Sequence, residues 1–404
     1  MRGEAAWLTI VGLGEGGAEG LSPAGRAALD AAEVIAGSAR HLALLATRLP
    51  HQRAEQLEWP VPFADGIPML LAQRGRRVVM LASGDPFWFG AGSSVARHLA
   101  PHEWQALPAV STFGLAASRL GWALENVSCL GLHAAPLTRL RPQLHPGARL
   151  LVLLRDGAAV SALARYLADA HFGNTAMTVL EALGGLRERR REATAATFDM
   201  NDVQHPVAVA LQIAGPGFAV PRSAGLPDDL FEHDGQITKQ RVRALALCAL
   251  APRPGETLWD IGAGSGSVGI EWLLAHPHCK AIAIEADAAR AARLRANADR
   301  LGVDRLRLIT GRAPDALAGL AAPQAVFIGG GLGDELLAHL WRTLPAGCRV
   351  VAHAVTLESE ALLTAWQARA GGSLLRIELA EAAPLGTRRG WRAAYPIVQW
   401  SASV

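Results

Sequence analysis

The chain has 404 residues, of which 50% are hydrophobic and 19% are charged. That length is too great for one ordinary hydrophobic core, so we expect two domains. The 39 Lys and Arg against 36 Asp and Glu give a net charge of +3, which is too even to require a nucleic-acid partner. The four cysteines are scattered, and their spacing indicates neither a disulfide framework nor a zinc site.

No segment has the pattern of a membrane span or an export signal. No run approaches ~18 uninterrupted apolar residues, so we expect no transmembrane helix. The start, MRGEAAWLTIVG, lacks the long apolar core and cleavage site of a signal peptide. The expected location is therefore the cytoplasm, with reduced cysteines.

Short apolar runs alternate with Ala-rich helical stretches through the first half of the chain. A Ser-Pro start predicts a helix over residues 22–32, and a second helix is predicted over 156–170. Strands are predicted over residues 7–12, 77–84, 148–155, 175–182 and 206–214. This alternation is typical of an α/β protein. The Pro- and Gly-rich segment 214–229 then predicts a linker.

The same alternation restarts after the linker. A helix is predicted over 238–251, followed by parallel strands and helices from residue 257 to residue 370. Two last strands, 373–379 and 392–400, follow one another without a helix between them. A parallel sheet that ends in such a pair is the arrangement of class I methyltransferases.

A glycine-rich turn follows the first strand of the second half. The strand reaches Asp260, and Gly262, Gly264 and Gly266 allow the backbone to turn beneath a ligand. Glu285 ends the next strand, 19 residues after Gly266, where it can accept hydrogen bonds from two ribose hydroxyls. The pattern predicts a ligand that contains a nucleoside.

The spacing of this turn favours one nucleoside ligand over the others. Ser267 occupies the place of the third glycine of a dinucleotide fingerprint, and no Gly-Lys-Ser/Thr of a phosphate-binding P-loop follows. Asp260 would repel a pyrophosphate but suits the cationic methionine portion of S-adenosylmethionine (SAM). A sheet turn with incidental glycines is the alternative. The ordered combination of Asp260, the glycines and Glu285 favours SAM over that alternative.

Residues 226–404 resemble the decarboxylating cobalt-precorrin-6B C15-methyltransferases. The stretches that carry the resemblance are LPDDLFEHDGQITKQRVR (226–243), WDIGAGSGSVGIEW (259–272), AIEAD (283–287), GRAPDAL (311–317) and AVFIGGG (325–331). The resemblance implies SAM contacts at Thr238, Gly262, Ala263, Gly264, Ser265, Gly266, Glu285 and Ala313. Arg241 and Arg312 depart from the family pattern, which has a Glu and an Asp there.

The first half begins with IVGLGEGG (10–17), a weak signal by itself. Three further stretches strengthen it: GSARHL (37–42), LASGDPFWFG (81–90) and PAVSTFGLAASRLGW (108–122). Together they resemble the tetrapyrrole methylase family, in its cobalt-precorrin-7 C5-methyltransferase branch, over about residues 6–213. Members hold SAM in a cleft between two α/β lobes. The resemblance places Gly12, Gly14, Gly84, Asp85, Ser111 and Thr112 at this cleft. Glu15, Ala109 and Val110 depart from the family pattern.

The order of the two halves resembles the fused precorrin-6Y C5,15-methyltransferases (decarboxylating) of cobalamin biosynthesis. The resemblance implies a two-lobed tetrapyrrole methylase domain over 1–215 for carbon 5, a linker over 216–227, and a class I methyltransferase domain over 228–404 for carbon 15 and the decarboxylation. The expected reaction converts precorrin-6B to precorrin-8X with SAM as methyl donor. The expected partner is this small tetrapyrrole, with no nucleic acid and no membrane, and the expected assembly is a homo-oligomer.

The acidic side chains of such a substrate should meet arginines or backbone amides. The run TRRGWR (387–392) offers Arg388, Arg389, Trp391 and Arg392 for this, although a basic hairpin on a solvated face is an equal alternative. We interpret RERRRE (187–192) as a solvated loop, and HPHC (276–279) as a plain loop rather than a metal site. No acid, base or nucleophile is assigned from the sequence, because positioning is expected to dominate the catalysis.

Two other functions remain open from the sequence. In one, only the second half is catalytic and methylates RNA, with the first half as an adaptor. The even charge and the FIGGG segment (327–331) in place of an NPPY-like segment count against it. In the other, the chain is a SAM-binding sensor without enzymatic activity, and the two differently built sites argue against that.

Overall fold

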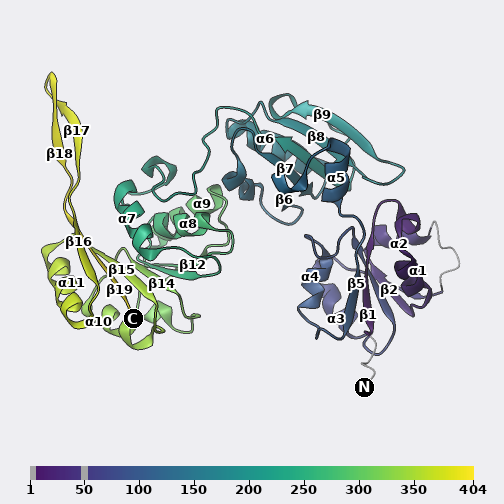
Figure 1. Ribbon diagram of the computed structural model, residues 1–404, viewed down its shortest axis with the longest axis horizontal. Helices are drawn as coiled ribbons and strands as arrows, with labels where there is room; N and C mark the ends of the chain where they lie inside the picture. The colour runs from purple at the N-terminus through teal and green to yellow at the C-terminus, as the bar shows by residue number, and fades with distance from the viewer. Residues whose placement is uncertain (1–5, 47–52) are drawn as a thin grey trace. The chain divides into compact units, whose positions relative to one another are not determined.

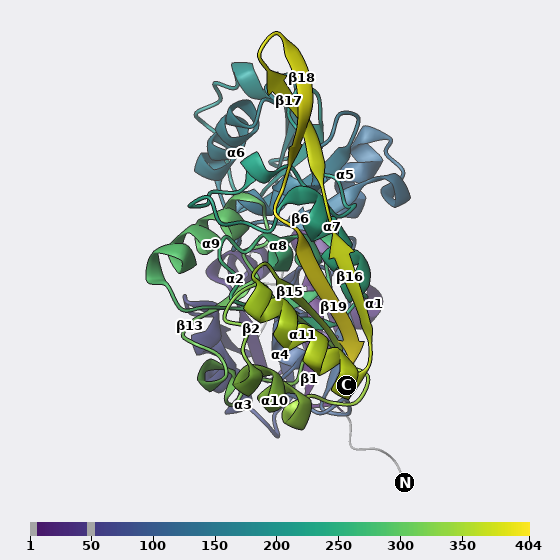
Figure 2. The ribbon, with the colours of Figure 1, turned by 90° about the vertical axis from the view of Figure 1, so that its left-hand side faces the viewer.

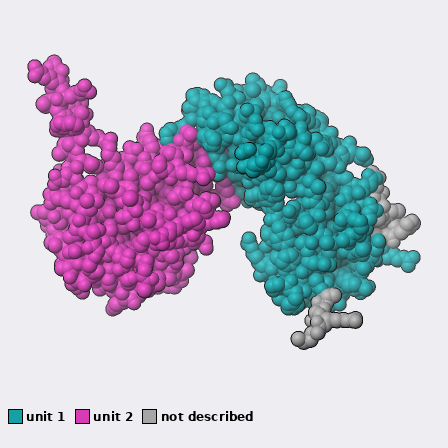
Figure 3. All heavy atoms as spheres, viewed as in Figure 1, with its two compact units in different colours: residues 1–137, 143–218 teal, residues 138–142, 219–404 magenta. Residues whose placement is uncertain are grey.

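The structure is a computed structural model that describes residues 6–46 and 53–404. The first five residues of the segment inspected for a signal peptide lie outside the described residues. The chain forms two compact units (Figure 3). Unit 1 contains residues 1–137 and 143–218, and unit 2 contains residues 138–142 and 219–404. Within the described residues, no helix combines the length and apolar character needed to cross a bilayer.

The first sheet of unit 1 is parallel, with its five described strands in the order β3-β2-β4-β1-β5. Figure 1 labels β1, β2 and β5 of this sheet. The strands are β1 (Leu8–Leu13), β2 (Val34–Gly37), β3 (Glu55–Glu58), β4 (Val78–Ser83) and β5 (Trp104–Leu107). The helices are α1 (Pro23–Asp30), α2 (Ala39–Ala46), α3 (Gly66–Leu71) and α4 (Ala91–Ala96). The predicted Ser-Pro helix start is confirmed, since the Ser22 hydroxyl accepts a hydrogen bond from the Gly25 N–H at 3.1 Å.

The second sheet of unit 1 is mixed, in the order β6-β7-β10-β8-β9. Its strands are β6 (Ser128–Gly131), β7 (Arg149–Leu154), β8 (Ala176–Glu181), β9 (Arg189–Thr194) and β10 (Val207–Gln212). Its helices are α5 (Thr112–Leu120) and α6 (Gly157–Asp169). Strand β10 runs antiparallel to both β7 and β8, and these three strands carry most of the sheet's buried side chains.

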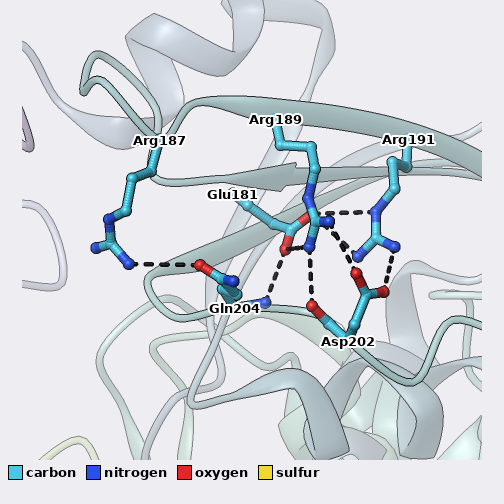
Figure 4. A network of polar contacts seen from close by, with 6 residues as sticks. All are labelled: Glu181, Arg187, Arg189, Arg191, Asp202 and Gln204. Atoms are coloured by element: carbon cyan, nitrogen blue, oxygen red, sulfur yellow. Dashed lines mark hydrogen bonds and ion pairs between the residues drawn. The ribbon is translucent and has the colours of Figure 1, made fainter.

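Our interpretation of RERRRE as a solvated loop is wrong, because Arg189–Thr194 forms the edge strand β9. The Glu181 side chain is only 1% exposed and accepts hydrogen bonds from Arg189 at 2.7 Å and from Arg191 at 3.1 Å. Asp202 joins both arginines on their outer side (Figure 4). A buried carboxylate needs such partners, so the arginines of this edge strand are tied to the sheet.

Unit 2 contains a seven-stranded sheet in the order β13-β12-β11-β14-β15-β19-β16. Its strands are β11 (Thr257–Ile261), β12 (Lys280–Glu285), β13 (Arg307–Thr310), β14 (Ala325–Ile328), β15 (Arg349–Ala354), β16 (Ser373–Ile377) and β19 (Ile397–Ser403). Strands β11 to β15 are parallel, and β19 runs antiparallel between β15 and β16. Together with unit 1, this confirms the predicted α/β class.

Helices cover both faces of the unit 2 sheet. They are α7 (Gln240–Leu250), α8 (Ser267–Ala275), α9 (Ala288–Arg300), α10 (Asp334–Thr343) and α11 (Leu357–Ala370). Side chains of α7, α8 and α9 form one buried cluster with Leu258, Phe327 and Val351. Side chains of α10 and α11 form the other cluster with Trp259 and Val350. Neighbouring strand residues therefore alternate between two cores, as expected for a sheet buried on both faces.

The prediction for the end of the chain is correct only in part. Strands β16 and β19 do pair, but a separate hairpin lies between them in the sequence, formed by β17 (Ala380–Leu385) and β18 (Arg388–Ala393). These two strands pair with each other and project from the rest of unit 2 (Figures 1 and 2). The predicted strand 392–400 joined the end of β18 to β19, although Pro396 lies between the two strands.

Candidate functional site

The glycine turn of unit 2 connects β11 to α8 at the carboxyl edge of the sheet. Gly262 has a φ of +67°, and a Cβ atom there would lie 2.5 Å from the Gly330 carbonyl oxygen. Gly266 has a φ of +76°, and a Cβ atom there would meet the Leu294 side chain at 2.6 Å. Both positions need glycine for close approach as well as for conformation. The turn therefore packs directly against its neighbours and leaves a cavity above it.

Glu285 at the end of β12 is held against this turn. Its Oε2 accepts a hydrogen bond from the Gly264 N–H at 2.8 Å, and its Oε1 accepts one from the Asp287 N–H at 2.9 Å. The residue is 6% exposed and lines the cavity. A carboxylate has about four lone-pair positions, so two remain for donors such as the hydroxyls of a ribose.

Asp260 is a buried acid one strand away, on β11. Its Oδ2 accepts a hydrogen bond from the Gly269 N–H at 2.9 Å, whereas its Oδ1 is buried without a hydrogen-bond partner. Burial raises the pKa of Asp260 to about 7, and the nearby Glu285 charge adds to the rise. A buried carboxylate without a countercharge is unfavourable. The site thus fits a ligand that brings a positive charge to Asp260, as the methionine portion of SAM would.

The cavity of unit 2 has a volume of about 540 Å³. It is lined by seven of the eight residues predicted from the resemblance: Thr238, Gly262, Ala263, Gly264, Ser265, Glu285 and Ala313. Gly266 does not line it, because it faces Leu294 in the core. The cavity is also lined by residues that the sequence did not single out as site residues, among them Gln236, Arg290 and His353. Gln236 and Arg290 belong to a chain of polar contacts, since the Arg290 Nη2 donates to Gln236 Oε1 at 2.7 Å.

Arg243, at the start of α7, is not available to bind an anion in the cavity. Its side chain is 0% exposed, and its Nε donates to Glu271 Oε1 at 2.5 Å. The same guanidinium also donates to Asp228 and to the carbonyl oxygens of Leu226 and Thr238. Arg243 therefore fastens the segment before α7 to the unit, including Thr238 on the cavity wall.

Unit 1 has a larger cavity of about 720 Å³, lined by the predicted Gly14, Gly84, Asp85, Ser111 and Thr112. The Ser111 hydroxyl caps α5 by accepting from the Gly114 N–H at 3.0 Å. Asp85 Oδ1 accepts from the Phe87 N–H at 2.8 Å, so this side chain stabilises its own turn.

Gly12 of unit 1 does not line the cavity, although the resemblance placed it there. A Cβ atom on Gly12 would overlap the carbonyl oxygen of Gly84 and the backbone nitrogen of Ala109. Its glycine is therefore required for the close packing of β1 against two loops that border the cavity.

Unit 1 contains a cluster of polar side chains that were not predicted as site residues from the sequence. The Arg40 Nη2 donates to Ser83 Oγ at 2.8 Å and to His41 Nε2 at 2.9 Å, and all three residues line the cavity. Burial, with the Arg40 charge as a second cause, lowers the pKa of His41 to about 3. Arg40 and His41 belong to the GSARHL stretch, which contributes to the resemblance to the tetrapyrrole methylases but does not by itself indicate a role for either side chain.

The predicted substrate-binding residues are not part of the unit 2 cavity wall. Arg388, Arg389, Trp391 and Arg392 belong to β18, and none of them lines either cavity. Trp391 is 80% exposed. Arg241 of α7 pairs with Glu381 on the opposite strand of the hairpin. The substrate role of the four β18 residues stays a prediction.

Comparison with known proteins covers both units. Residues 7–199 match the model of the tetrapyrrole (corrin/porphyrin) methylases, and residues 229–404 match that of the precorrin methyltransferase domain. A precorrin-6Y C(5,15)-methyltransferase (decarboxylating) from Sinorhizobium sp is 49% identical over 98% of this chain and 96% of its own length. A protein of the same name from Mycobacterium tuberculosis is 40% identical over 98% of this chain and 99% of its own.

Among solved structures, the C-terminal domain of precorrin-6Y C5,15-methyltransferase from Rhodobacter capsulatus is 54% identical to the matching segment. It covers 46% of this chain and 100% of its own, with a TM-score of 0.45.

Proposed function

Because the chain belongs to the precorrin-6Y C5,15-methyltransferase (decarboxylating) family, we propose that it methylates carbons 5 and 15 of precorrin-6B and removes carbon dioxide from the ring C acetate. The product is precorrin-8X, an intermediate of cobalamin biosynthesis. Enzymes of this family use S-adenosylmethionine, which supplies an electrophilic methyl group.

One observation carries the proposal: each unit has its own cavity, and each cavity is bordered by the residues that the sequence resemblance assigned to SAM. In unit 2, Glu285 has lone pairs left for ribose hydroxyls and Asp260 lacks a countercharge. In unit 1, Gly84, Ser111 and Thr112 border the cavity. A chain with a single catalytic site and an adaptor has no need for two such cavities.

The two units differ in construction, and we assign them different methylations. Unit 1, with the domain 1–215, is assigned the methylation of carbon 5. Unit 2, with the domain 228–404, is assigned the methylation of carbon 15 and the decarboxylation, and residues 216–227 are the linker. The resemblance of each half to a separate single-domain family supports this division.

The proposed chemistry depends mainly on positioning. Meso carbons of a reduced tetrapyrrole are enamine-like nucleophiles, so holding ring and methyl donor in line can supply ~7–11 kcal/mol of the barrier. Asp260 and Glu285 orient the donor by charge and by hydrogen bonds. The apolar side chains of Phe327 and Ile397 line the same cavity and favour loss of the acetate carboxylate, because its charge spreads into the ring as carbon dioxide leaves.

We also propose a homo-oligomer in the cytoplasm. We expect a second copy of the chain to cover the projecting hairpin, on which Leu385 is 70% exposed and Trp391 is 80% exposed. The four cysteines are free, in keeping with a reducing compartment. Light scattering on the purified chain would measure the assembly, and a monomer at micromolar concentration would contradict this part of the proposal.

The test of the function is incubation of the full chain with SAM and precorrin-6B, followed by mass spectrometry of the tetrapyrrole. We expect a product with two added methyl groups and one carbon dioxide lost. A gel-shift assay with RNA tests the alternative RNA methyltransferase. Methylated RNA with unchanged precorrin-6B would overturn the proposal.

A further inference from the structure

His353 lies at the carboxyl end of β15 and lines the unit 2 cavity. On this strand Val350, Ala352 and Ala354 pack into the core beneath α10 and α11, whereas Val351 packs into the core on the α7 face. Side chains alternate along a strand, so His353 shares the α7 face with Val351. It stands one step beyond that core, at the cavity wall.

The hydrogen bonds of His353 define which ring nitrogen carries its proton. Its Nε2 lies 3.0 Å from Oε1 of Gln399, its cross-strand partner on β19. The Gln399 Nε2 donates to Ser401 Oγ at 3.2 Å, which directs the amide oxygen toward the histidine. Because an amide oxygen only accepts hydrogen bonds, Nε2 holds the proton and Nδ1 keeps its lone pair.

The ring is held in place, and Nδ1 is left available. The Phe327 ring meets the His353 ring edge-on, with centroids 5.1 Å apart. Within the described residues, no hydrogen bond to Nδ1 is present, and Nδ1 is not among the buried polar atoms that lack a partner. Burial lowers the pKa of His353, and the Gln399 hydrogen bond opposes this only in part. At neutral pH the group is therefore an uncharged base with a fixed tautomer.

The sheet order places His353 at the far end of the site from the nucleoside-binding acid. Glu285 ends β12, Asp260 is on β11, and His353 is on β15, with β14 between β11 and β15. Three strand spacings separate β12 from β15, or about 14 Å. If Glu285 holds the ribose and Asp260 the cationic portion of the donor, the methyl acceptor enters on the β15 side.

We propose that His353 is the base that accepts the proton released from the tetrapyrrole when carbon 15 is methylated. The inference rests on the function proposed for unit 2. Carbon 15 forms its bond to the methyl group as the carbon–sulfur bond of SAM breaks, and the electron pair of that bond stays on sulfur. The carbon 15–hydrogen bond then breaks, its electron pair restores the ring double bond, and the proton moves to Nδ1. Gln399 Oε1 keeps the hydrogen bond of the imidazolium, which later loses its proton to solvent.

The test uses the full chain with SAM and precorrin-6B and compares wild type, His353→Ala and His353→Gln. We expect methylation at carbon 15 to slow by about 10²–10⁴-fold in both variants, the usual contribution of a general base. The dissociation constant for SAM should stay unchanged, and added imidazole should restore part of the activity of His353→Ala. His339→Ala, a histidine of α10 that does not line the cavity, is the matched control and should keep the wild-type rate.

The pH profile separates a base from a structural side chain. In wild type, the rate of the unit 2 step should rise as His353 loses its proton, below the ordinary histidine pKa of 6.5. At saturating SAM, where the positive charge of the donor keeps Asp260 ionised, this acidic limb of the pH–rate profile should vanish in His353→Ala; Lys239, Glu285, Arg290 and Arg312 are the other ionisable groups that line the cavity. Gln399→Leu should displace the limb to lower pH, because the hydrogen bond that raises the pKa of His353 is lost. NMR titration of the imidazole in the SAM-bound chain should report the same pKa.

The outcomes distinguish this inference from the proposed function. If wild type forms no product methylated at carbon 15, the function proposed for unit 2 fails. If wild type forms it and His353→Ala retains both its rate and its acidic limb, the role of His353 is overturned. A variant that loses SAM affinity in proportion to its rate would likewise overturn it, because His353 would then act on the donor.

Discussion

Asp260 links the stability of unit 2 to pH. Burial raises the pKa of this carboxyl from 3.8 to about 7. A carboxyl with a raised folded-state pKa contributes stability in its protonated form, and the contribution is lost as the pH rises through that pKa. We expect the melting temperature of the ligand-free chain to fall between about pH 4 and pH 7, the range between the unfolded and folded pKa values, more steeply in wild type than in Asp260→Asn. Thermal denaturation at constant ionic strength measures both slopes.

Bound SAM should oppose the loss of stability with rising pH, and this provides the control for the experiment. A positive charge beside Asp260 favours its carboxylate, so the gain in melting temperature on adding SAM should be larger at the higher pH. In Asp260→Asn that pH dependence should be absent, and SAM affinity should fall by about 10–100-fold, as for a lost hydrogen bond to a charged group. Equal slopes in the two proteins would show that Asp260 is not the group responsible.

Gly262 and Gly264 provide a matched pair for the packing of the turn. Both have positive φ angles, +67° and +57°, so alanine at either position costs ~1–2 kcal/mol in backbone strain. Only Gly262 is also crowded by backbone, since its nearest neighbour for a Cβ is Gly330 at 2.5 Å, whereas at Gly264 it is Gln236 at 4.0 Å. We expect Gly262→Ala to destabilise unit 2 at least twice as much as Gly264→Ala. Hydrogen exchange of unit 2 peptides measures the difference, and equal protection in both variants would contradict it.

At the scale of single residues, the sequence predicts the site role of side chains that belong to short motifs with fixed spacing. Asp260, the glycines and Glu285 follow strand ends at fixed spacing, and the structure brings them to one cavity edge. His353 has no such motif, because it ends an apolar strand and its role depends on Gln399, which is 46 residues away in the sequence. Contacts between distant strands are not visible in local spacing.

Helix α7 carries two arginines of opposite character, Arg241 and Arg243. Arg243 is fully buried and paired with Glu271, which is 3% exposed, whereas Arg241 is 64% exposed and paired with Glu381 at the hairpin. Removing one partner of a buried ion pair costs ~3–5 kcal/mol, whereas an exposed pair contributes less than ~1 kcal/mol. We expect Arg243→Ala to destabilise unit 2 by the larger amount and Arg241→Ala to be nearly neutral. Urea unfolding followed by hydrogen exchange in unit 2 would show this.

Replacing Arg243 should also change the unit 2 cavity. Arg243 holds the Thr238 carbonyl oxygen, and Thr238 lines the cavity. Arg243→Ala should therefore weaken SAM binding in unit 2 even under conditions where the unit stays folded, whereas Arg241→Ala should not. If both variants bound SAM as wild type does, the segment before α7 would be positioned without Arg243.

Helices and strands whose apolar residues repeat with a regular spacing were predictable from the sequence. Elements that form only because of contacts with distant parts of the chain were not. Buried parallel strands such as β11 and β12 read directly as apolar runs. Strand β9 has the composition of a loop, and it is a strand because Glu181 and Asp202 neutralise its arginines. The sequence offered a basic solvated hairpin only as an alternative for 387–392, and its partner strand β17 was not predicted, because both strands are largely exposed and neither core imposes a pattern on them.

At the scale of the whole chain, the two cavities should act as independent SAM sites. Each is lined entirely by residues of its own unit. Isothermal titration of the full chain should therefore give two molecules of SAM per chain. Glu285→Ala removes the carboxylate that faces the unit 2 cavity, and Gly12→Ala introduces a Cβ that overlaps Gly84 behind the unit 1 cavity. Each variant should bind one molecule of SAM.

Because the two sites are expected to act independently, the products that each variant forms can also be predicted. Glu285→Ala should lose methylation at carbon 15 together with the decarboxylation, because both are assigned to unit 2, and it should keep the unit 1 activity toward a substrate already methylated at carbon 15. Gly12→Ala should give a tetrapyrrole with one added methyl group and one carbon dioxide lost. Mass spectrometry of the products of each variant, alone and mixed in equal amounts, checks both expectations.

The mixture should restore the doubly methylated product, because an intermediate released by one intact unit can be completed by the other. If Glu285→Ala instead lost methylation at carbon 5, the assignment of the two units would have to be exchanged.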